Sequence, residues 1–299
     1  MTKLSARGLP RSRLAALSFA LVAALLVTPG LAHSKPAGHW WHPGPLSSWQ
    51  YDLDWPVAVP TRLGPVQAYD IDWDGSGQGT EGQVRELVAR IRSEGGHAIC
   101  YVDVGAWENY RPDASEYSPK LLGASMDGYP DERYVDIRQW ADDPGPGGAT
   151  LSRILAARFE RCKSEGFSGV ETDIDDSYTD NTGFPLTLGD EVTFDTRVAN
   201  LLHSLGLAWF LKNGINGDSF ITDMEPLADG TVNEQCWQYQ ECSALVPFVK
   251  AHKPVLNVEY VPEDEASICR QALAFPMATM DTDVNLEGDL NWACWAQSH

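Results

Sequence analysis

Short runs of apolar and β-branched residues alternate with helical patterns along most of this chain. Six of these runs are typical of buried strands, and they cover residues 66–72, 98–105, 169–173, 207–212, 232–235 and 255–259. Between the runs, apolar residues recur three and four positions apart, as they do on the buried face of a helix. These helical patterns cover residues 84–91, 151–162, 194–205 and 264–273. Strands that alternate with helices predict a parallel sheet with helical crossovers.

The alternation predicts one closed barrel. Two weaker strand patterns, at residues 49–54 and 276–280, bring the number of predicted strands to eight. No change in composition divides the chain, and eight strand–helix units need about 250 residues. We therefore predict an α/β fold in which residues 48–299 form a single (β/α)8 barrel of the TIM type. An open, doubly wound sheet is the alternative, although no glycine-rich phosphate loop follows an early strand.

The first 32 residues are typical of a secretory signal peptide. Basic residues precede an apolar run at residues 14–27, and Pro29, Gly30 and Ala32 follow it. The run is short for a bilayer span, so we expect a secreted protein that is not embedded in a membrane. An uncleaved membrane anchor is the alternative. Residues 33–47 are rich in His, Pro, Gly and Ser and predict a flexible lead-in to the barrel.

The six cysteines predict up to three disulfides, because the thiols of exported chains are usually oxidised. Six cysteines allow 15 sets of pairs, and the sequence leaves the choice open. Bridging between near neighbours favours Cys236 with Cys242 and Cys269 with Cys294, which leaves Cys100 and Cys162. No CxxC motif occurs, so we expect neither a zinc site nor a redox site.

The chain is strongly acidic, with a formal net charge of −20 at pH 7. A surface of this charge repels nucleic-acid phosphates and anionic lipid headgroups. We therefore expect neither nucleic acid nor a membrane as a partner, whereas cationic and neutral partners stay open. The simpler alternative is that the acidity only keeps an exported protein soluble.

Carboxylate, amide and aromatic residues stand at the end of nearly every predicted strand. In a closed parallel barrel these ends meet on one rim, where active sites are built from the loops that follow the strands. Several carboxylates crowded with Tyr and Trp rings are what the hydrolysis of a sugar bond requires. The alternative for any single residue is a helix cap or an ion pair with Lys212. The candidates are Asp70, Asp72, Tyr101, Asp103, Trp107, Glu171, Asp173, Asp176, Tyr178, Lys212, Asn213, Glu234, Glu259 and Tyr260.

The segment Asp70-Ile-Asp-Trp-Asp-Gly75, with Glu81, also matches the pattern of a calcium-binding loop. It follows a predicted strand rather than a helix, and Gly77 stands where an apolar residue would anchor such a loop. We therefore interpret the segment as a turn that carries Asp70 or Asp72 to the rim. The histidines show no shared spacing for a metal, so we expect no metal and no cofactor.

With these motifs the sequence resembles glycoside hydrolase family 114, the endo-α-1,4-polygalactosaminidase type. The resemblance covers residues 48–290, nearly all of the chain that follows the predicted signal peptide. It implies a TIM-like barrel that hydrolyses α-1,4-linked galactosamine polymers, which are cationic where deacetylated. The segments that carry it include Tyr69-Asp-Ile-Asp72, Cys100-Tyr-Val-Asp-Val-Gly-Ala-Trp-Glu108, Leu211-Lys-Asn213, Asn233-Glu-Gln-Cys236 and Asn257-Val-Glu-Tyr260.

One family motif is altered in this chain. A motif resembling Glu-Pro-Asp-Asn-x-Asp-Gly-Tyr aligns with Glu171-Thr-Asp-Ile-Asp-Asp-Ser-Tyr178. Thr172, Ile174 and Ser177 replace the family's Pro, Asn and Gly. The two acids of the motif and its tyrosine, at Asp173, Asp176 and Tyr178, stand in register.

We therefore hypothesise a secreted, monomeric, endo-acting glycosidase with Asp173 as nucleophile and Glu234 as acid/base in a retaining mechanism. Asp176 is the alternative nucleophile, and an inverting outcome stays open. The proposed substrate is a cationic galactosamine polymer, bound by Asp70, Asp72, Asp103, Glu171, Asp176, Lys212, Asn213 and Glu259, with rings from Tyr101, Trp107, Tyr178 and Tyr260. A non-catalytic carbohydrate-binding barrel and a glycosidase of a neutral α-glycan are the alternative functions.

Overall fold

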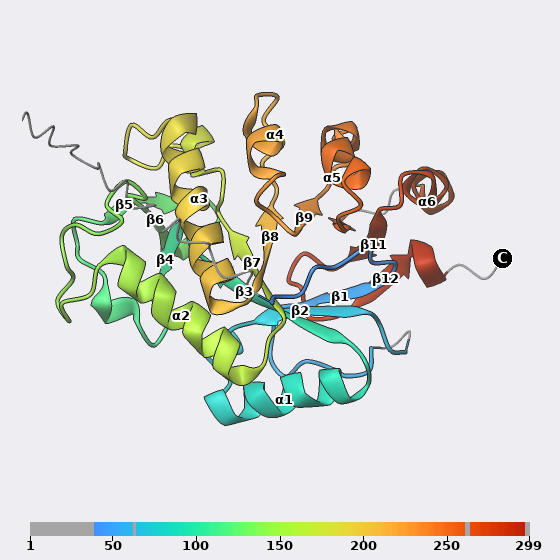
Figure 1. The fold of residues 1–299 in the computed structure, drawn as a ribbon, viewed down its shortest axis with the longest axis horizontal. Helices are drawn as coiled ribbons and strands as arrows, with labels where there is room; N and C mark the ends of the chain where they lie inside the picture. The colour runs from blue at the N-terminus through green and yellow to red at the C-terminus, as the bar shows by residue number, and fades with distance from the viewer. Residues whose placement is uncertain (1–38, 62–63, 261–263, 297–299) are drawn as a thin grey trace, which may run out of the picture. The chain divides into compact units, whose positions relative to one another are not determined.

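The computed structural model describes residues 39–61, 64–260 and 264–296 (Figure 1). In its main sheet, eight parallel strands lie side by side in the order in which they occur along the chain. They are β1 (Trp49–Asp52), β2 (Ala68–Asp72), β3 (His97–Asp103), β7 (Gly169–Asp173), β8 (Ala208–Lys212), β9 (Gly230–Glu234), β10 (Val255–Glu259) and β11 (Ala278–Thr282). A ninth strand, β12 (Leu290–Ala293), pairs antiparallel with β11. Each of the eight strands predicted from the sequence is therefore present.

Contacts between the first and last parallel strands close the sheet into a barrel. The indole Nε1 of Trp49 in β1 donates to the carbonyl of Ala278 in β11 at 2.9 Å. Just beyond β1, the backbone N–H of Leu53 donates to the carbonyl of Leu286 at 2.9 Å. The fold is a (β/α)8 barrel, as the strand–helix alternation predicts.

Helices occupy six of the connections between parallel strands in the described part of the chain. They are α1 (Glu81–Ser93), α2 (Leu151–Glu165), α3 (Leu188–Leu205), α4 (Phe220–Met224), α5 (Val246–Lys250) and α6 (Glu265–Ala274). Four short 3₁₀ turns accompany them, η1 (Ala114–Glu116), η2 (Ser177–Thr179), η3 (Cys242–Leu245) and η4 (Cys294–Ala296). Thr80 and Thr187 form capping boxes at the starts of α1 and α3, and left-handed Gly166 and Gly206 end α2 and α3.

A small antiparallel sheet is inserted between β3 and α2, and the sequence did not predict it. It consists of β4 (Ala106–Glu108), β5 (Leu122–Met126) and β6 (Tyr129–Val135), in the order β4-β6-β5. In Figure 1 it lies beside α2 and α3, away from β11 and α6. The tip of its β5–β6 hairpin reaches the cavity described below, so the insertion contributes to the site.

The described part of the chain has two apolar cores, one inside the barrel and one between the barrel and the helices. Residues that point inward along the strands form one core, which includes Trp49, Tyr51, Phe210, Leu256 and Met280. Residues that point outward form the other core, against the helices. Side chains of a strand alternate between its two faces, so the inward positions nearest the carboxyl ends are left for the charged groups of the rim.

All six cysteines lie in the described part of the chain and form three disulfides. The pairs are Cys100–Cys162, Cys236–Cys242 and Cys269–Cys294, which are the pairs that bridging between near neighbours favours. The first links β3 to α2, the second closes the loop after β9, and the third ties α6 to the segment after β12.

The predicted signal peptide lies outside the described residues, as do residues 33–38 of the predicted lead-in. The described part of the lead-in, residues 39–47, contains no helix or strand. It is nevertheless held against the barrel, because Trp40 stacks on His203 and Trp41 stacks on His97. None of the helices in the described ranges combines the length and apolar character needed to cross a lipid bilayer.

Candidate active site

A cavity of about 760 Å³ opens at the carboxyl ends of the parallel strands. Nine of the fourteen candidate residues line it, from six different strands or the loops after them. They are Asp72, Tyr101, Asp103, Asp173, Asp176, Lys212, Asn213, Glu234 and Tyr260. Asp173 and Glu234, which are 61 positions apart in the sequence, therefore face one hollow.

Lys212 is the central cation of this cavity. Its Nζ lies 3.4 Å from Oδ2 of Asp173, 3.6 Å from Oε2 of Glu234 and 3.2 Å from Oε1 of Glu171. The ammonium is buried, and these carboxylates raise the pKa of Lys212 well above its usual range despite the opposing effect of burial. Lys212 is therefore charged at physiological pH, and its ammonium contacts both Asp173 and Glu234.

Donors hold both carboxylates in fixed orientations. Asp173 accepts hydrogen bonds from the Tyr101 hydroxyl at 2.7 Å and from the backbone N–H of Ile174 at 2.9 Å. Glu234 accepts one from Nδ2 of Asn213 at 3.0 Å and another from the Tyr260 hydroxyl. Each carboxylate still reaches the cavity, because its side chain is 18% exposed for Asp173 and 27% for Glu234.

The separation of the two carboxylates bears on stereochemistry. Two oxygens that lie 3.4 and 3.6 Å from one nitrogen atom are at most about 7 Å apart. Retaining glycosidases place their carboxyl groups about 5–5.5 Å apart, whereas inverting ones need about 6.5–9.5 Å to admit a water molecule. The upper limit set by the shared contact with Lys212 admits the retaining separation and overlaps only the lower end of the inverting range.

The backbone turns sharply just after three of these strands. Ile174, Asn213 and Gln235 follow Asp173, Lys212 and Glu234 directly, and they have φ angles of 60°, 50° and 62°. This left-handed region is unfavourable for residues other than glycine, and most of all for a β-branched one. Strained backbone of this kind concentrates at functional sites, where it aims side chains that a regular strand would direct elsewhere.

Five candidate residues lie outside the lining of the cavity. Asp70 and Glu171 are fully buried inside the barrel, and neither is exposed to the hollow. The carboxylate of Glu259 instead accepts hydrogen bonds from the backbone of Trp237 and Gln238 and so anchors the loop after β9. The other two candidates are the aromatic residues Trp107 and Tyr178. The Trp107 indole donates a hydrogen bond to the carbonyl of Ala114, and the Tyr178 hydroxyl donates one to Asp218.

Asp72 lines the cavity, yet its oxygens are already occupied. They accept hydrogen bonds from both terminal nitrogens of Arg111 and from the backbone of Asp74 and Ser76. Arg111 lowers the pKa of Asp72 against the effect of burial. The segment resembling a calcium loop is thus a turn held by an arginine. Within the described ranges, no group of three or more His, Cys, Asp or Glu side chains could hold a metal ion.

The inserted sheet supplies lining residues that sequence reasoning missed. Glu132 of β6 faces the cavity, and burial together with Glu108 raises the pKa of Glu132 to about 7. Tyr129, at the start of β6, also lines it with 56% of its surface exposed. The Asp127-Gly128 pair is a hairpin signal that could have located this tip. Tyr51 was missed because it lies inside a strand rather than at its end.

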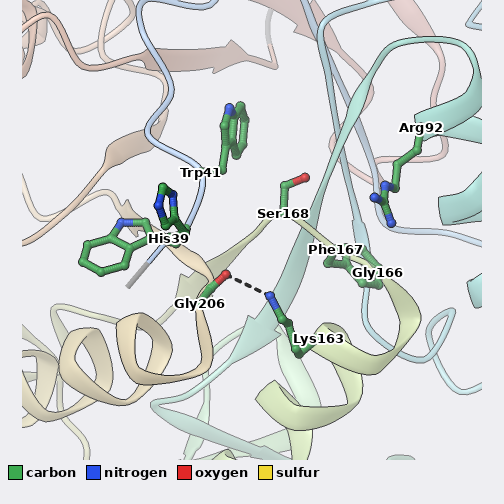
Figure 2. A pocket seen from close by; sticks show the side chains of 9 residues that line it. His39, Trp41, Arg92, Lys163, Gly166, Phe167, Ser168 and Gly206 are labelled. Carbon is green, nitrogen blue, oxygen red and sulfur yellow. Dashed lines mark hydrogen bonds between the residues drawn. The ribbon is translucent and has the colours of Figure 1, made fainter. Parts of the chain in front are cut away.

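A second cavity, of about 310 Å³, lies at the opposite ends of the strands (Figure 2). Arg92 and Lys163 line it from the last turns of α1 and α2, and Lys163 donates to the carbonyl of Gly206 at 3.1 Å. Cations in these positions compensate the carbonyl ends of helices. No Asp or Glu is among the described residues that line this cavity, so it offers no acid/base pair.

Glycosidic bonds are cleaved by two carboxyl groups that flank the scissile bond. This barrel, with two carboxyl groups in one cavity, belongs to a glycoside hydrolase. The chain belongs to glycoside-hydrolase family GH114, whose model matches residues 31–298. Among curated proteins, none matches this sequence.

Two solved structures are similar to this chain. The crystal structure of Aspergillus fumigatus Ega3 in complex with galactosamine superposes with a TM-score of 0.73, at 26% identity, and the match covers 84% of this chain and 97% of that one. The glycoside hydrolase domain of PelA from Pseudomonas aeruginosa superposes with a TM-score of 0.55, at 13% identity over 80% of this chain and 95% of that domain. At that identity, the second match supports the fold alone.

Proposed function

We propose that this protein is a secreted, monomeric, endo-acting enzyme that cleaves α-1,4-linked galactosamine-containing polysaccharide with retention of configuration. The observation that carries the proposal is the contact of one buried ammonium, Lys212, with both Asp173 and Glu234 in an acidic cavity. The likeness to Ega3, whose structure contains galactosamine, supports this substrate class. Three disulfides fit an oxidising compartment outside the cell.

In the proposed mechanism Asp173 attacks the anomeric carbon while Glu234 donates its proton to the departing glycosidic oxygen. A covalent glycosyl–enzyme intermediate forms on Asp173. Glu234 then takes a proton from water, and that water displaces Asp173 from the sugar. The contacts from Lys212 and the Tyr101 hydroxyl hold the Asp173 carboxylate in place for the attack.

The charge of the cavity supports a cationic substrate. Seven carboxylates and two cations are among the described residues that line it, and both cations are paired with carboxylates. The carboxylates of Asp103, Glu132 and Asp176 form no ion pair within the part of the chain that the structure describes. An incoming sugar ammonium would favour the ionised form of Glu132, so binding would release a proton near pH 7.

The test uses the two isosteric substitutions Asp173→Asn and Glu234→Gln, with Glu160→Gln on the exposed face of α2 as the matched control. Each of the first two should lower the release of reducing ends from a galactosamine polymer by at least about a hundredfold, whereas the control should not. The melting temperatures of the variants check that the fold is intact. Asp176→Asn tests the alternative nucleophile.

Full activity in both Asp173→Asn and Glu234→Gln would contradict the assignment of roles. Polymers graded in N-acetylation test the substrate class, because turnover that ignores both acetylation and salt would favour a neutral α-glycan instead. Binding without turnover on every polymer would indicate a non-catalytic carbohydrate-binding barrel. The anomeric configuration of the first product, followed by NMR, tests retention.

A further inference from the structure

A pair of fully buried carboxyl groups lies beneath the floor of the cavity. Asp70 of β2 and Glu171 of β7 both point into the barrel, and both are 0% exposed. The two carboxyl groups lie close enough that each affects the pKa of the other. Neither oxygen of Asp70 nor Oε2 of Glu171 has a hydrogen-bond donor within reach among the described residues.

Two ionised carboxylates cannot satisfy each other, because each can only accept a hydrogen bond. Leaving several buried oxygens unsatisfied would cost several kcal/mol, and two adjacent negative charges would add to this cost. A single proton between the two groups removes both penalties, since one carboxyl then donates to the other.

The donors around the pair decide which group holds the proton. Oε1 of Glu171 accepts a hydrogen bond from the Tyr51 hydroxyl at 3.1 Å and lies 3.2 Å from Nζ of Lys212. These donors stabilise negative charge on Glu171, whereas no such donor reaches Asp70. Burial, and next the nearby Glu171, raise the pKa of Asp70 well above its usual range, in the direction that the geometry requires.

We propose that Asp70 is protonated and donates a hydrogen bond to the ionised carboxylate of Glu171, and that this singly charged pair balances Lys212 beneath Asp173 and Glu234. Asp70 and Glu171 are then positioning residues that act through Lys212 rather than on the sugar. The charged and titratable groups that face the pair are Tyr51 from β1, Asp173 from β7, Lys212 from β8 and Glu234 from β9. The consequence for catalysis rests on the function proposed above, but the protonation of Asp70 does not.

The consequence follows from counting charge. The single negative charge of the pair offsets the positive charge of Lys212. Removing the charge of Glu171 would leave the charge of Lys212 less compensated, so a proton that catalysis needs in the cavity above would be lost at lower pH.

The first test compares the wild-type protein with Asp70→Asn by infrared spectroscopy near neutral pH. Asn retains the size of a protonated Asp and can still donate to Glu171. The difference spectrum should contain the carbonyl stretching band of one protonated carboxylic acid, present in the wild type and lost in the variant. The absence of this band would overturn the proposal.

The same two proteins give an independent readout in their thermal stability. A carboxyl group that is protonated in the folded protein and ionised in the unfolded chain lowers the free energy of unfolding as the pH rises. The melting temperature of Asp70→Asn should therefore match the wild type near pH 4 and exceed it by about 3 °C or more near pH 8. If Asp70 is ionised and paired with Lys212, the variant will instead fall below the wild type as the pH rises, and the proposal is wrong.

The catalytic consequence is tested with Glu171→Gln on a galactosamine polymer. The alkaline limb of the pH–rate profile should move to lower pH by about one pH unit in this variant, and by clearly less in Asp70→Asn. Equal shifts in the two variants would contradict the role of the pair in setting the charge at Lys212. If the wild type cleaves no such polymer, the proposed function fails, while the infrared and stability measurements still decide the protonation of Asp70.

Discussion

At the scale of single residues, Ile174 is the clearest conflict between local preference and observed structure. It stands directly after Asp173 with φ at 60°, and its backbone N–H donates to that carboxylate at 2.9 Å. The resembling family motif has Asn at this position, a residue that tolerates the left-handed region much better than a β-branched one. This chain therefore accepts strain next to the carboxylate that we propose as the nucleophile.

Replacing the isoleucine should release this strain. We expect Ile174→Asn to raise the free energy of unfolding by about 1 kcal/mol, which is about 2–4 °C in the melting temperature. Differential scanning calorimetry measures the change. Ile174→Val is the matched control, because valine keeps the branch at Cβ and should bring no gain. A melting temperature that falls equally in both variants would mean that packing of the side chain outweighs the backbone strain.

At the scale of elements, Arg111 fixes the loops on one side of the rim. Its guanidinium is 1% exposed and pairs with Asp72 after β2, with Asp74 in the following turn, and with Glu108 of β4. The carboxylates raise the pKa of Arg111 further above its usual range against the effect of burial. One cation thus joins the end of a barrel strand to the inserted sheet, and the geometry of the cavity wall depends on it.

Removing this cation should be far more damaging than removing a surface one. Arg111→Ala leaves three buried carboxylates without their partner, and we expect a loss of about 3–5 kcal/mol, or roughly 10 °C in the melting temperature. The control is Arg85→Ala, which breaks an ion pair with Glu81 whose side chains are 51% and 59% exposed. That change should cost less than about 0.5 kcal/mol. Similar losses in the two variants, measured by thermal unfolding, would contradict the structural role of Arg111.

At the scale of the whole molecule, buried carboxyl groups determine how stability depends on pH. Burial raises the pKa of Asp52 to about 7 and that of Glu191 to about 8. Each group binds its proton more tightly in the folded protein than in the unfolded chain. Their contribution is therefore fully present below about pH 4 and is lost as the pH rises through about 7–8. Asp136 and Asp229, whose pKa values are lowered by hydrogen bonds, act in the opposite sense and lose their contribution in acid.

These two sets of groups predict a maximum of stability in mildly acidic solution, near about pH 5, and a fall of the melting temperature towards about pH 8. Thermal unfolding across this range measures it. Glu191→Gln should reduce the fall, because the buried carboxyl is replaced by an amide that can still accept from Ser177 and Tyr178. Glu160→Gln, on the exposed face of α2, should leave the fall unchanged. A melting temperature that rises from pH 5 to pH 8 would contradict the prediction.

The sequence by itself determined the barrel, its eight parallel strands and the polar residues at the strand ends, because the periods of helices and strands are local properties of the chain. It also indicated the short-range disulfides. Only the tertiary structure decided which strand-end residues share the cavity. Because side chains alternate along a strand, Glu259 points away from the cavity. Asp70 and Glu171 lie deeper inside the barrel and are buried. Asp72 is already paired with Arg111. The inserted sheet and the meeting of Asp173, Lys212 and Glu234 depend on contacts between distant parts of the chain, and no local pattern encodes such contacts.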